Sequence, residues 1–389
     1  MKDIVIAAGK RTPMGEYGGA LRDLTANELG AIAAKAAITQ SQFQPSDFDH
    51  AVFGNAMQTS ADSIYGARHV ALRADLPIEL PALTVNRLCG SGIQSVISAA
   101  QLIQLGEANV VLAGGMESMS QAPHVIRGAR WGLRLGEGKL EDSLMVSLMD
   151  SYCGCSMAVT AENLARKYNI SREKQDEFAL RSQKSAAAAL DAGKFKDEVT
   201  PVEVKTRKGV ELFDRDDHMR PDTTLEGLAK LKPAFSKDGF VTAGNASGIV
   251  DGAAAVVVTT ADRAKGKPLG RIVSWGIAGV PPDIMGIGPV PAIKLALEKG
   301  GLKLADLDLI EINEAFAGQY LACEQALELD RNKVNVNGGA IALGHPLGAS
   351  GTRLIMTVLY ELKRRNKRYG VASACIGGGQ GIAIIVEAA

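Results

Sequence analysis

The sequence predicts an α/β fold made of two similar halves, with a long insertion inside the first half. Three observations predict it. Short apolar runs alternate with helical stretches in residues 1–115 and again in 267–389. Residues 116–248 are richer in charge and turns, and two distant segments share one pattern. Strand–helix alternation is typical of a sheet that is covered by helices.

The elements of the first half follow one another closely. We expect strands at 3–8, 50–55, 82–89 and 109–118, with helices at 25–38 and 90–106. Thr25 is the predicted N-cap of the first helix, and Gly106 is the predicted end of the second. In the insertion, 171–195 reads as a solvent-facing helix, with Ser171 as N-cap and Gly193 as its stop signal. We expect the insertion to lie over the core rather than to form sheet.

The second half repeats the alternation after a strand that starts near residue 251. Strands are expected at 271–276, 308–313, 369–375 and 381–389, and helices at 289–301, 314–329 and 352–365. The segments 85–92 and 334–351 both begin Val-Asn, become glycine-rich, enter a helix and return in an apolar strand. This repeat suggests two related halves. The predicted domains are 1–117 with 249–266, the inserted domain 118–248, and 267–389.

Composition excludes several classes of protein. The 389 residues carry 43 Lys and Arg against 43 Asp and Glu, so a general nucleic-acid binder is not expected. Five cysteines are too few, and odd in number, for a disulfide scaffold, which favours a reducing compartment. No apolar run approaches the roughly 18 residues of a membrane span, and the start lacks a signal sequence. We expect a cytoplasmic protein, or a mitochondrial matrix protein if the source is eukaryotic.

Cys89 lies where a predicted strand meets a predicted helix, within Asn-Arg-Leu-Cys-Gly-Ser-Gly at 86–92. A thiol at the start of a helix faces the positive end of the helix dipole, so we expect its thiolate to be stabilised. The alternative is a small buried core residue, which is the usual place of a free cysteine. The local sequence leaves both interpretations open.

His345 lies among five glycines in residues 338–351. Because Pro346 follows it, the histidine is expected on a turn before the next helix, where it can serve as a base or hydrogen-bond donor. The alternative is a structural histidine in a turn. We expect surface or packing roles for His50, His69, His124 and His218.

Cys375 ends a predicted strand and precedes a glycine loop whose free N–H groups can form an oxyanion hole. The alternative is a core cysteine beside a hairpin turn. Asn313 stands between a strand and a helix, where the favoured interpretation is a helix N-cap and the other is an amide that holds a water or an oxyanion. Cys153 and Cys155 are too closely spaced for ordinary zinc ligation, and we interpret them and Cys323 as structural.

Taken together, these segments resemble the thiolase family. The resemblance rests on NRLCGSGIQS around Cys89, NEAFA at 313–317, NGGAIALGHPLGASG around His345 and CIGGGQGIA around Cys375. AGNASGIVDGAAA at 243–255 is similar to the CoA-contacting segment of that family. The resemblance implies a five-layer αβαβα arrangement of two α/β halves with an inserted loop domain. It also implies CoA-dependent cleavage of a 3-ketoacyl-CoA, or the reverse Claisen condensation.

The resemblance assigns a role to each catalytic candidate. Cys89 would be the acylated nucleophile, activated by His345. Cys375 would be the acid that protonates the departing acetyl-CoA enolate and the base that later deprotonates the incoming CoA. Asn313, through a water, would join His345 in stabilising the thioester oxygen. The N–H groups of Cys89 and Gly377 would hold the other oxyanion.

The resemblance also implies contacts with CoA, which is a substrate, so no metal or other cofactor is expected. Ser247 would touch the pantetheine, and Arg220 and Thr223 would lie near the nucleotide. Met157 and Met285 would border the channel for the acyl chain and the pantetheine. Family members are dimers or dimers of dimers. The loop at 116–145 leads us to expect a homotetramer.

One departure bears on the subtype. Biosynthetic acetoacetyl-CoA thiolases usually place a histidine before the methionine at 157, whereas Ser156 stands here. The loop is more similar to the matrix-type 3-ketoacyl-CoA thiolases of β-oxidation, so we favour thiolysis with broad chain-length tolerance. The alternatives are a biosynthetic thiolase, a ketoacyl synthase, which the second cysteine disfavours, and a non-catalytic acyl-CoA or lipid carrier.

Overall fold

The computed structural model describes residues 2–136 and 138–389. Within them, a ten-stranded sheet has the order β14-β15-β16-β13-β1-β12-β5-β3-β4, and β2 pairs with β12. The strands are β1 (Ile4–Arg11), β2 (Gly15–Glu16), β3 (His50–Gly54), β4 (Ala82–Val85), β5 (Val110–Glu117), β12 (Val250–Thr260), β13 (Gly270–Gly279), β14 (Leu309–Ile312), β15 (Tyr369–Ile376) and β16 (Gln380–Ala388).

The two halves of this sheet repeat one pairing pattern. In the first, β3 is parallel to β5, β5 is antiparallel to β12, and β12 is antiparallel to β1. In the second, β14 is parallel to β15, β15 is antiparallel to β16, and β16 is antiparallel to β13. The halves meet where β1 pairs with β13 at only two positions, Val5 with Arg271 and Ile6 with Gly270. The expectation of two similar halves is confirmed.

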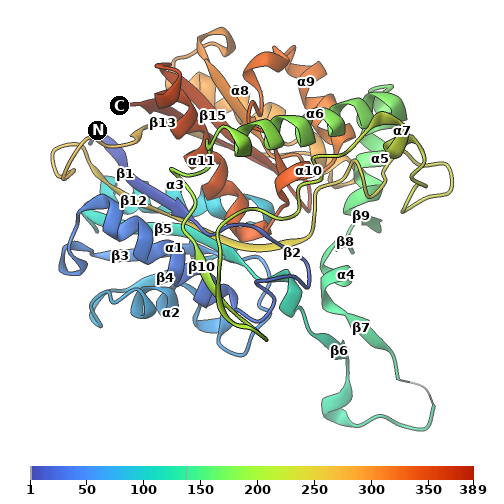
Figure 1. The fold of residues 1–389 in the computed structure, drawn as a ribbon, viewed down its shortest axis with the longest axis horizontal. Helices are drawn as coiled ribbons and strands as arrows, with labels where there is room; N and C mark the ends of the chain where they lie inside the picture. Colours follow the sequence, from blue (N-terminus) through green and yellow to red (C-terminus); the bar gives the residue numbers. More distant parts are fainter. Residues whose placement is uncertain (1, 137) are drawn as a thin grey trace.

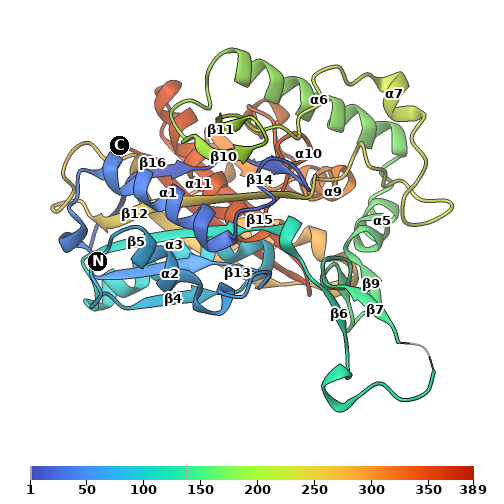
Figure 2. The ribbon, with the colours of Figure 1, turned by 60° about the horizontal axis from the view of Figure 1, so that its bottom comes forward.

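Helices form three layers around these strands (Figures 1 and 2). The central helices α3 (Ser91–Leu105) and α11 (Leu347–Arg364) share one buried cluster with strands of both halves. A second cluster joins α1 (Ala26–Ser41) and α2 (Gly66–Arg73) to β3, β5 and β12, and a third joins α8 (Pro289–Gly300) and α9 (Ala317–Leu327) to β14–β16. The result is the expected αβαβα order of layers.

Local signals set several helix ends as expected. Thr25 caps α1 with a capping box, in which its hydroxyl accepts from the Glu28 N–H and the Glu28 carboxylate accepts from the Thr25 N–H. Ser171 caps α6 (Arg172–Asp191), and Gly106 ends α3 with a φ of 80°. Such caps satisfy backbone groups that have no partner inside the helix.

The insertion contains four helices and three small hairpins within its described residues. The helices are α4 (Ser143–Ser147), α5 (Met157–Lys167), α6 and α7 (Leu225–Ala229). The hairpins pair β6 (His124–Ile126) with β7 (Leu140–Asp142), β8 (Met149–Asp150) with β9 (Cys155–Ser156), and β10 (Val202–Thr206) with β11 (Gly209–Phe213). The expectation of no sheet is therefore wrong in detail, because short ribbons form, although none joins the large sheet. The β6–β7 arm projects from the body in both views (Figures 1 and 2).

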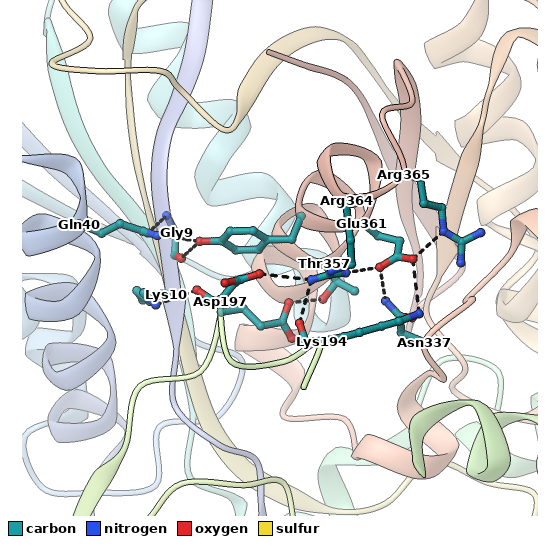
Figure 3. A network of polar contacts seen from close by, with 12 residues as sticks. Gly9, Lys10, Gln40, Lys194, Asp197, Asn337, Thr357, Glu361, Arg364 and Arg365 are labelled. Atoms are coloured by element: carbon teal, nitrogen blue, oxygen red, sulfur yellow. Dashed lines mark hydrogen bonds and ion pairs between the residues drawn. The ribbon is translucent and has the colours of Figure 1, made fainter. Parts of the chain in front are cut away.

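Polar contacts fix the second half of α11 against three other segments (Figure 3). The Tyr360 hydroxyl donates to the Gly9 carbonyl oxygen of β1 at 2.8 Å. The Thr357 hydroxyl donates to Glu198 of the insertion at 3.0 Å, and Asn337 donates to Glu361 at 2.9 Å. These buried contacts hold α11 in place. His345 lies just before α11, after the short helix α10 (Ala340–Leu343). No helix in the described part of the chain is both long and apolar enough to cross a membrane.

Candidate active site

Cys89 lies in a 3₁₀ turn, Leu88–Gly90, directly before α3. Hydrogen bonds on both sides hold this turn, since the Arg87 N–H donates to the Ser91 hydroxyl at 2.8 Å and Leu88 N–H donates to Asn86 at 2.9 Å. A Cβ on Gly90 would lie 2.6 Å from Ile376 of β15. The missing side chain at Gly90 therefore leaves room for the turn to pack closely against the strand that carries Cys375.

The thiol of Cys89 is harder to ionise than the sequence suggests. Burial raises its pKa to about 11, although hydrogen bonds from the N–H groups of Gly377 and of Cys89 itself act in the opposite direction. The charge of Glu117 adds to the increase. The expected stabilisation of the thiolate by the helix start is thus outweighed by desolvation. The nucleophile needs a base that removes its proton as it reacts.

His345 lies on the turn between α10 and α11, as expected. Its ring Nδ1 is 2.5 Å from the Ser350 hydroxyl, which itself donates to the Pro346 carbonyl oxygen at 3.0 Å. The hydroxyl hydrogen is thus used, so Nδ1 carries the proton that Ser350 accepts and Nε2 is left as the basic nitrogen. Within the described residues, buried Nε2 has no hydrogen-bond partner. Burial, then the charge of Arg353, lowers the pKa of His345 to about 3, so the ring is neutral.

Asn313 does not cap a helix. The helix α9 begins four residues later, after Phe316, whereas the Asn313 N–H continues the sheet by donating to the Ser373 carbonyl oxygen at 2.9 Å. Its side-chain amide is buried, and neither its oxygen nor its nitrogen has a partner among the described residues. The N-cap interpretation is wrong because the chain between strand and helix is too long. The amide remains available for a ligand or a water.

Glu314, the residue after Asn313, anchors the connection between β14 and α9. Its buried carboxylate accepts from the Ser182 hydroxyl at 2.6 Å, the Asn335 amide at 2.8 Å and the Ile341 N–H at 3.2 Å. These partners lie on α6, on the segment after α9 and on α10. The strand-to-helix connection is therefore fixed from three sides.

Cys375 lies in β15 and is completely buried. Burial, followed by the neighbouring Cys89, raises its pKa well above the usual value, so this thiol is protonated. It packs in one cluster with Met285, Ala315, Met157 and Phe316. The glycine loop that follows is also the hairpin turn from β15 to β16, so the structural and functional interpretations of this turn are compatible.

Two adjoining cavities lie beside these residues. The larger, of about 520 Å³, has Met157, Ser247 and His345 in a mainly apolar wall. The smaller, of about 220 Å³, has Cys89 and Gly377 in its wall. Both cavities share the residues Leu148, Met149, Met157 and Leu347. The structure thus brings the nucleophile candidate and the base candidate to adjoining cavities with a shared wall. Met285 packs in one cluster with Cys375 and is not among the residues that line these two cavities.

Arg220 and Thr223 line a separate recess of about 460 Å³, together with Glu16 and His218. The Arg220 guanidinium donates to Glu16 at 2.5 Å and to the His218 carbonyl oxygen at 2.8 Å. The segment 243–249 forms part of this recess and part of the larger cavity. The five CoA candidates therefore do not share one cavity, and one segment connects the two spaces.

Three contributors were missed by the sequence analysis. Ser350 positions His345, and His218 lines the recess instead of only packing. Glu117 accepts from the N–H groups of Ala56, Met57 and Gly348 at 2.8–3.0 Å, and burial raises its pKa to about 7. The sequence signal that could have identified Glu117 is its position as a single acidic residue at the end of an otherwise apolar strand. In the described residues, no group of three or more His, Cys, Asp or Glu is arranged to hold a metal ion.

Comparisons with known proteins cover the whole chain. Residues 4–262 match the thiolase N-terminal domain, and residues 266–388 match the thiolase C-terminal domain. The chain is 56% identical to the human mitochondrial 3-ketoacyl-CoA thiolase, with 100% of this chain and 98% of the relative covered. It is 51% identical to an acetyl-CoA acetyltransferase of Pseudomonas aeruginosa, with 99% of each covered. The crystal structure of the human thiolase in complex with CoA matches with a TM-score of 0.97 at 55% identity, covering 100% of this chain and 98% of that one.

Proposed function

The chain belongs to the thiolase family, and we propose that it cleaves a 3-ketoacyl-CoA with a second CoA to give acetyl-CoA and a shortened acyl-CoA. The observation that carries this proposal is the neutral, buried His345, whose Nε2 lacks a partner in the described residues and which lines a cavity that adjoins the cavity of Cys89. An unpaired basic nitrogen beside a thiol of raised pKa suits a reaction in which the proton moves only when substrate is attacked.

In the first half-reaction, Nε2 of His345 takes the Cys89 proton while the sulfur attacks the keto carbon. The N–H groups of Cys89 and Gly377 hold the negative charge on the keto oxygen. Cleavage of the carbon–carbon bond leaves an acyl group on Cys89 and an enolate of acetyl-CoA. The protonated Nε2, with a water held by Asn313, stabilises the thioester oxygen of this enolate.

Cys375 serves both half-reactions. Because its pKa is raised by burial, it enters the cycle as a thiol and donates its proton to the enolate carbon, which releases acetyl-CoA. The resulting thiolate removes the proton of the incoming CoA. The CoA thiolate then attacks the acyl-Cys89 thioester and the shortened acyl-CoA leaves. The protonated Nε2 of His345 returns its proton to the departing Cys89 sulfur, which restores the thiol and the neutral histidine. Every proton in this cycle is carried by a residue of the chain, and no metal or other cofactor takes part.

We further propose that the physiological direction is degradative and that the enzyme accepts a range of chain lengths. Ser156 stands where biosynthetic family members usually carry histidine. Its hydroxyl accepts from the Val159 N–H at 3.3 Å as the N-cap of α5 and lines the 520 Å³ cavity. A serine leaves more space beside the acyl chain than an imidazole does. The competing proposal, a biosynthetic acetoacetyl-CoA thiolase, has the support of relatives named acetyl-CoA acetyltransferase.

The proposed assembly is a homotetramer in the cytoplasm, or in the mitochondrial matrix if the source is eukaryotic. The projecting β6–β7 arm supports the assembly, because Trp131 and Leu133 are 86% and 59% exposed there. Large apolar side chains in such a position are typical of a surface that another subunit covers.

The deciding experiment measures CoA-dependent loss of the enolate absorbance of acetoacetyl-CoA and of a 3-ketoacyl-CoA with ten acyl carbons. We expect a higher kcat/KM for the longer substrate, and an acyl group on the peptide that contains Cys89. Activity confined to acetoacetyl-CoA would overturn the degradative assignment, and absence of turnover with both would overturn the proposed reaction.

A further inference from the structure

The β8–β9 hairpin carries two thiols, Cys153 and Cys155, that the proposed reaction does not use. They are separated only by Gly154. The Gly154 N–H donates to the Asp150 carbonyl oxygen at 2.9 Å, and the Tyr152 N–H donates to the Asp150 carboxylate at 2.8 Å. The hairpin turn is therefore held by one acidic residue at its base.

The two thiols are close together and accessible. The Cys155 thiol donates to the Cys153 carbonyl oxygen at 3.6 Å, which places its sulfur beside the neighbouring cysteine. Both are partly exposed, whereas Cys323 and Cys375 are buried. Gly154 has a φ of 70°, and no described atom lies within 4 Å of the position that a Cβ would take. The turn thus has both the backbone freedom and the space to rearrange.

The hairpin is part of the wall of the active-site cavities. Gly154 and Ser156 line the larger cavity, and Met149 lines both. Beyond the hairpin, Met157 lies against the glycine loop, with its sulfur 3.2 Å from the position of a Cβ on Gly377. A change in the turn therefore reaches the substrate channel within two or three residues.

We propose that Cys153 and Cys155 form a reversible disulfide that acts as a thiol-sensitive switch on the channel wall. Two thiols one residue apart close a small ring, which cannot form without moving the turn between β8 and β9. Strained and exposed disulfides have less negative potentials and are the labile, regulatory ones. A metal site is the less suitable function, because no third ligand completes a metal-binding group within the described residues.

The oxidant in this step is a low-molecular-weight disulfide such as glutathione disulfide. One cysteine thiolate of the pair attacks a sulfur of the oxidant, which breaks its disulfide bond and releases one glutathione thiolate that takes up a proton. The second thiolate attacks the mixed disulfide and releases the second glutathione. Two protein thiols are oxidised and one glutathione disulfide is reduced to two thiols. Since desolvation raises the pKa of Cys153, the exchange is faster in mildly alkaline buffer.

The test incubates the full-length protein with mixtures of reduced and oxidised glutathione at pH 8, blocks free thiols by alkylation and digests with trypsin. Trypsin releases residues 140–166 as one peptide that contains both cysteines. We expect this peptide to lose two hydrogens and to resist alkylation in the oxidising mixtures, and to regain two alkylation sites after a dithiol reductant. This readout does not depend on the proposed function.

The effect on turnover rests on the proposed function and needs a matched control, because Cys89 also reacts with disulfides. The double variant C153S/C155S keeps Cys89 and removes only the pair. Oxidation should lower kcat/KM of the natural protein at least about threefold further than that of the variant, and reduction should reverse the difference. A peptide that stays fully alkylated in every mixture would overturn the site. If the disulfide forms in the natural protein but oxidation lowers the activity of the natural protein and of the variant equally, the disulfide is not a switch.

Discussion

Ser350→Ala tests how His345 is held in its reactive form. The Ser350 hydroxyl accepts from Nδ1 at 2.5 Å and is completely buried, so no solvent replaces it. Removing one partner of a buried hydrogen bond costs about 1–3 kcal/mol. If the lost hydrogen bond destabilises the transition state by this amount, because the His345 ring is no longer held in the right orientation and tautomer, kcat decreases about 5- to 150-fold. The conversion uses about 1.4 kcal/mol of activation free energy per factor of ten in rate. The KM for CoA should change little, because Ser350 does not line the cavity.

The assay is steady-state thiolysis of one 3-ketoacyl-CoA at several pH values, with unfolding in urea as a measure of stability. Ser95→Ala is the matched control, because the buried Ser95 hydroxyl donates to the Gly92 carbonyl oxygen at 2.9 Å and does not contact His345. We expect similar losses of stability in both variants and a loss of kcat only in Ser350→Ala. A kcat within about twofold of the natural value would refute the reasoning that Ser350 fixes the base.

Four further predictions concern the nucleophile, the base, the CoA recess and the arm. Cys89→Ser should abolish turnover, with no acyl-enzyme in mass spectra, while CoA binding measured by calorimetry persists. Because burial lowers the pKa of His345 from 6.5 to about 3, its contribution to stability is complete above pH 6.5 and is lost as the pH falls toward 3. As the pH falls from 6.5 toward 3, the free energy of unfolding should therefore decrease less in His345→Asn than in the natural protein, as measured by urea titrations. Arg220→Ala should raise the KM for CoA about tenfold or more with kcat nearly unchanged, as expected for a phosphate contact worth about 1.5–3 kcal/mol. Trp131→Glu should lower the mass found by light scattering from about four times to about twice the 40.8 kDa chain.

Each of these predictions has a result that would contradict it. Acyl-enzyme in Cys89→Ser would place the nucleophile elsewhere, and equal acid sensitivity in His345→Asn would mean that other groups control acid unfolding. An unchanged KM in Arg220→Ala would separate the recess from CoA. A natural protein of twice the chain mass would contradict the tetramer itself.

The ion pair between Arg220 and Glu16 bears on the proposed contact of Arg220 with CoA. Both side chains are partly exposed, so the pair itself contributes little to stability. A phosphate that reaches Arg220 competes with the Glu16 carboxylate for the same guanidinium. The guanidinium also donates to the carbonyl oxygens of Asp217, His218 and Met219, so it is folded back against its own loop, and the proposed phosphate contact requires it to leave Glu16.

Sequence reasoning succeeded wherever the signal was local. The alternation of apolar runs determined the strands, and the caps at Thr25 and Ser171 followed from side chains that accept from N–H groups three residues on. The glycine loops around Cys89 and His345 could be located because glycine is needed where two backbones approach closely. The same reasoning erred at Asn313, where residue type was a reliable signal for a cap but gave no information on the length of the connection that follows.

The sequence by itself determined the α/β class, the repeat of two halves, the family and the identity of the candidate reactive groups, because each is a property of local pattern or of motif. Only the tertiary structure decided their ionisation and their surroundings. Burial by residues far away in the chain reverses the expected stabilisation of the Cys89 thiolate and keeps His345 neutral. It also brings the Cys153–Cys155 hairpin to the wall of the channel. Desolvation and proximity depend on what the folded chain packs around a residue, and no local stretch of sequence contains that information.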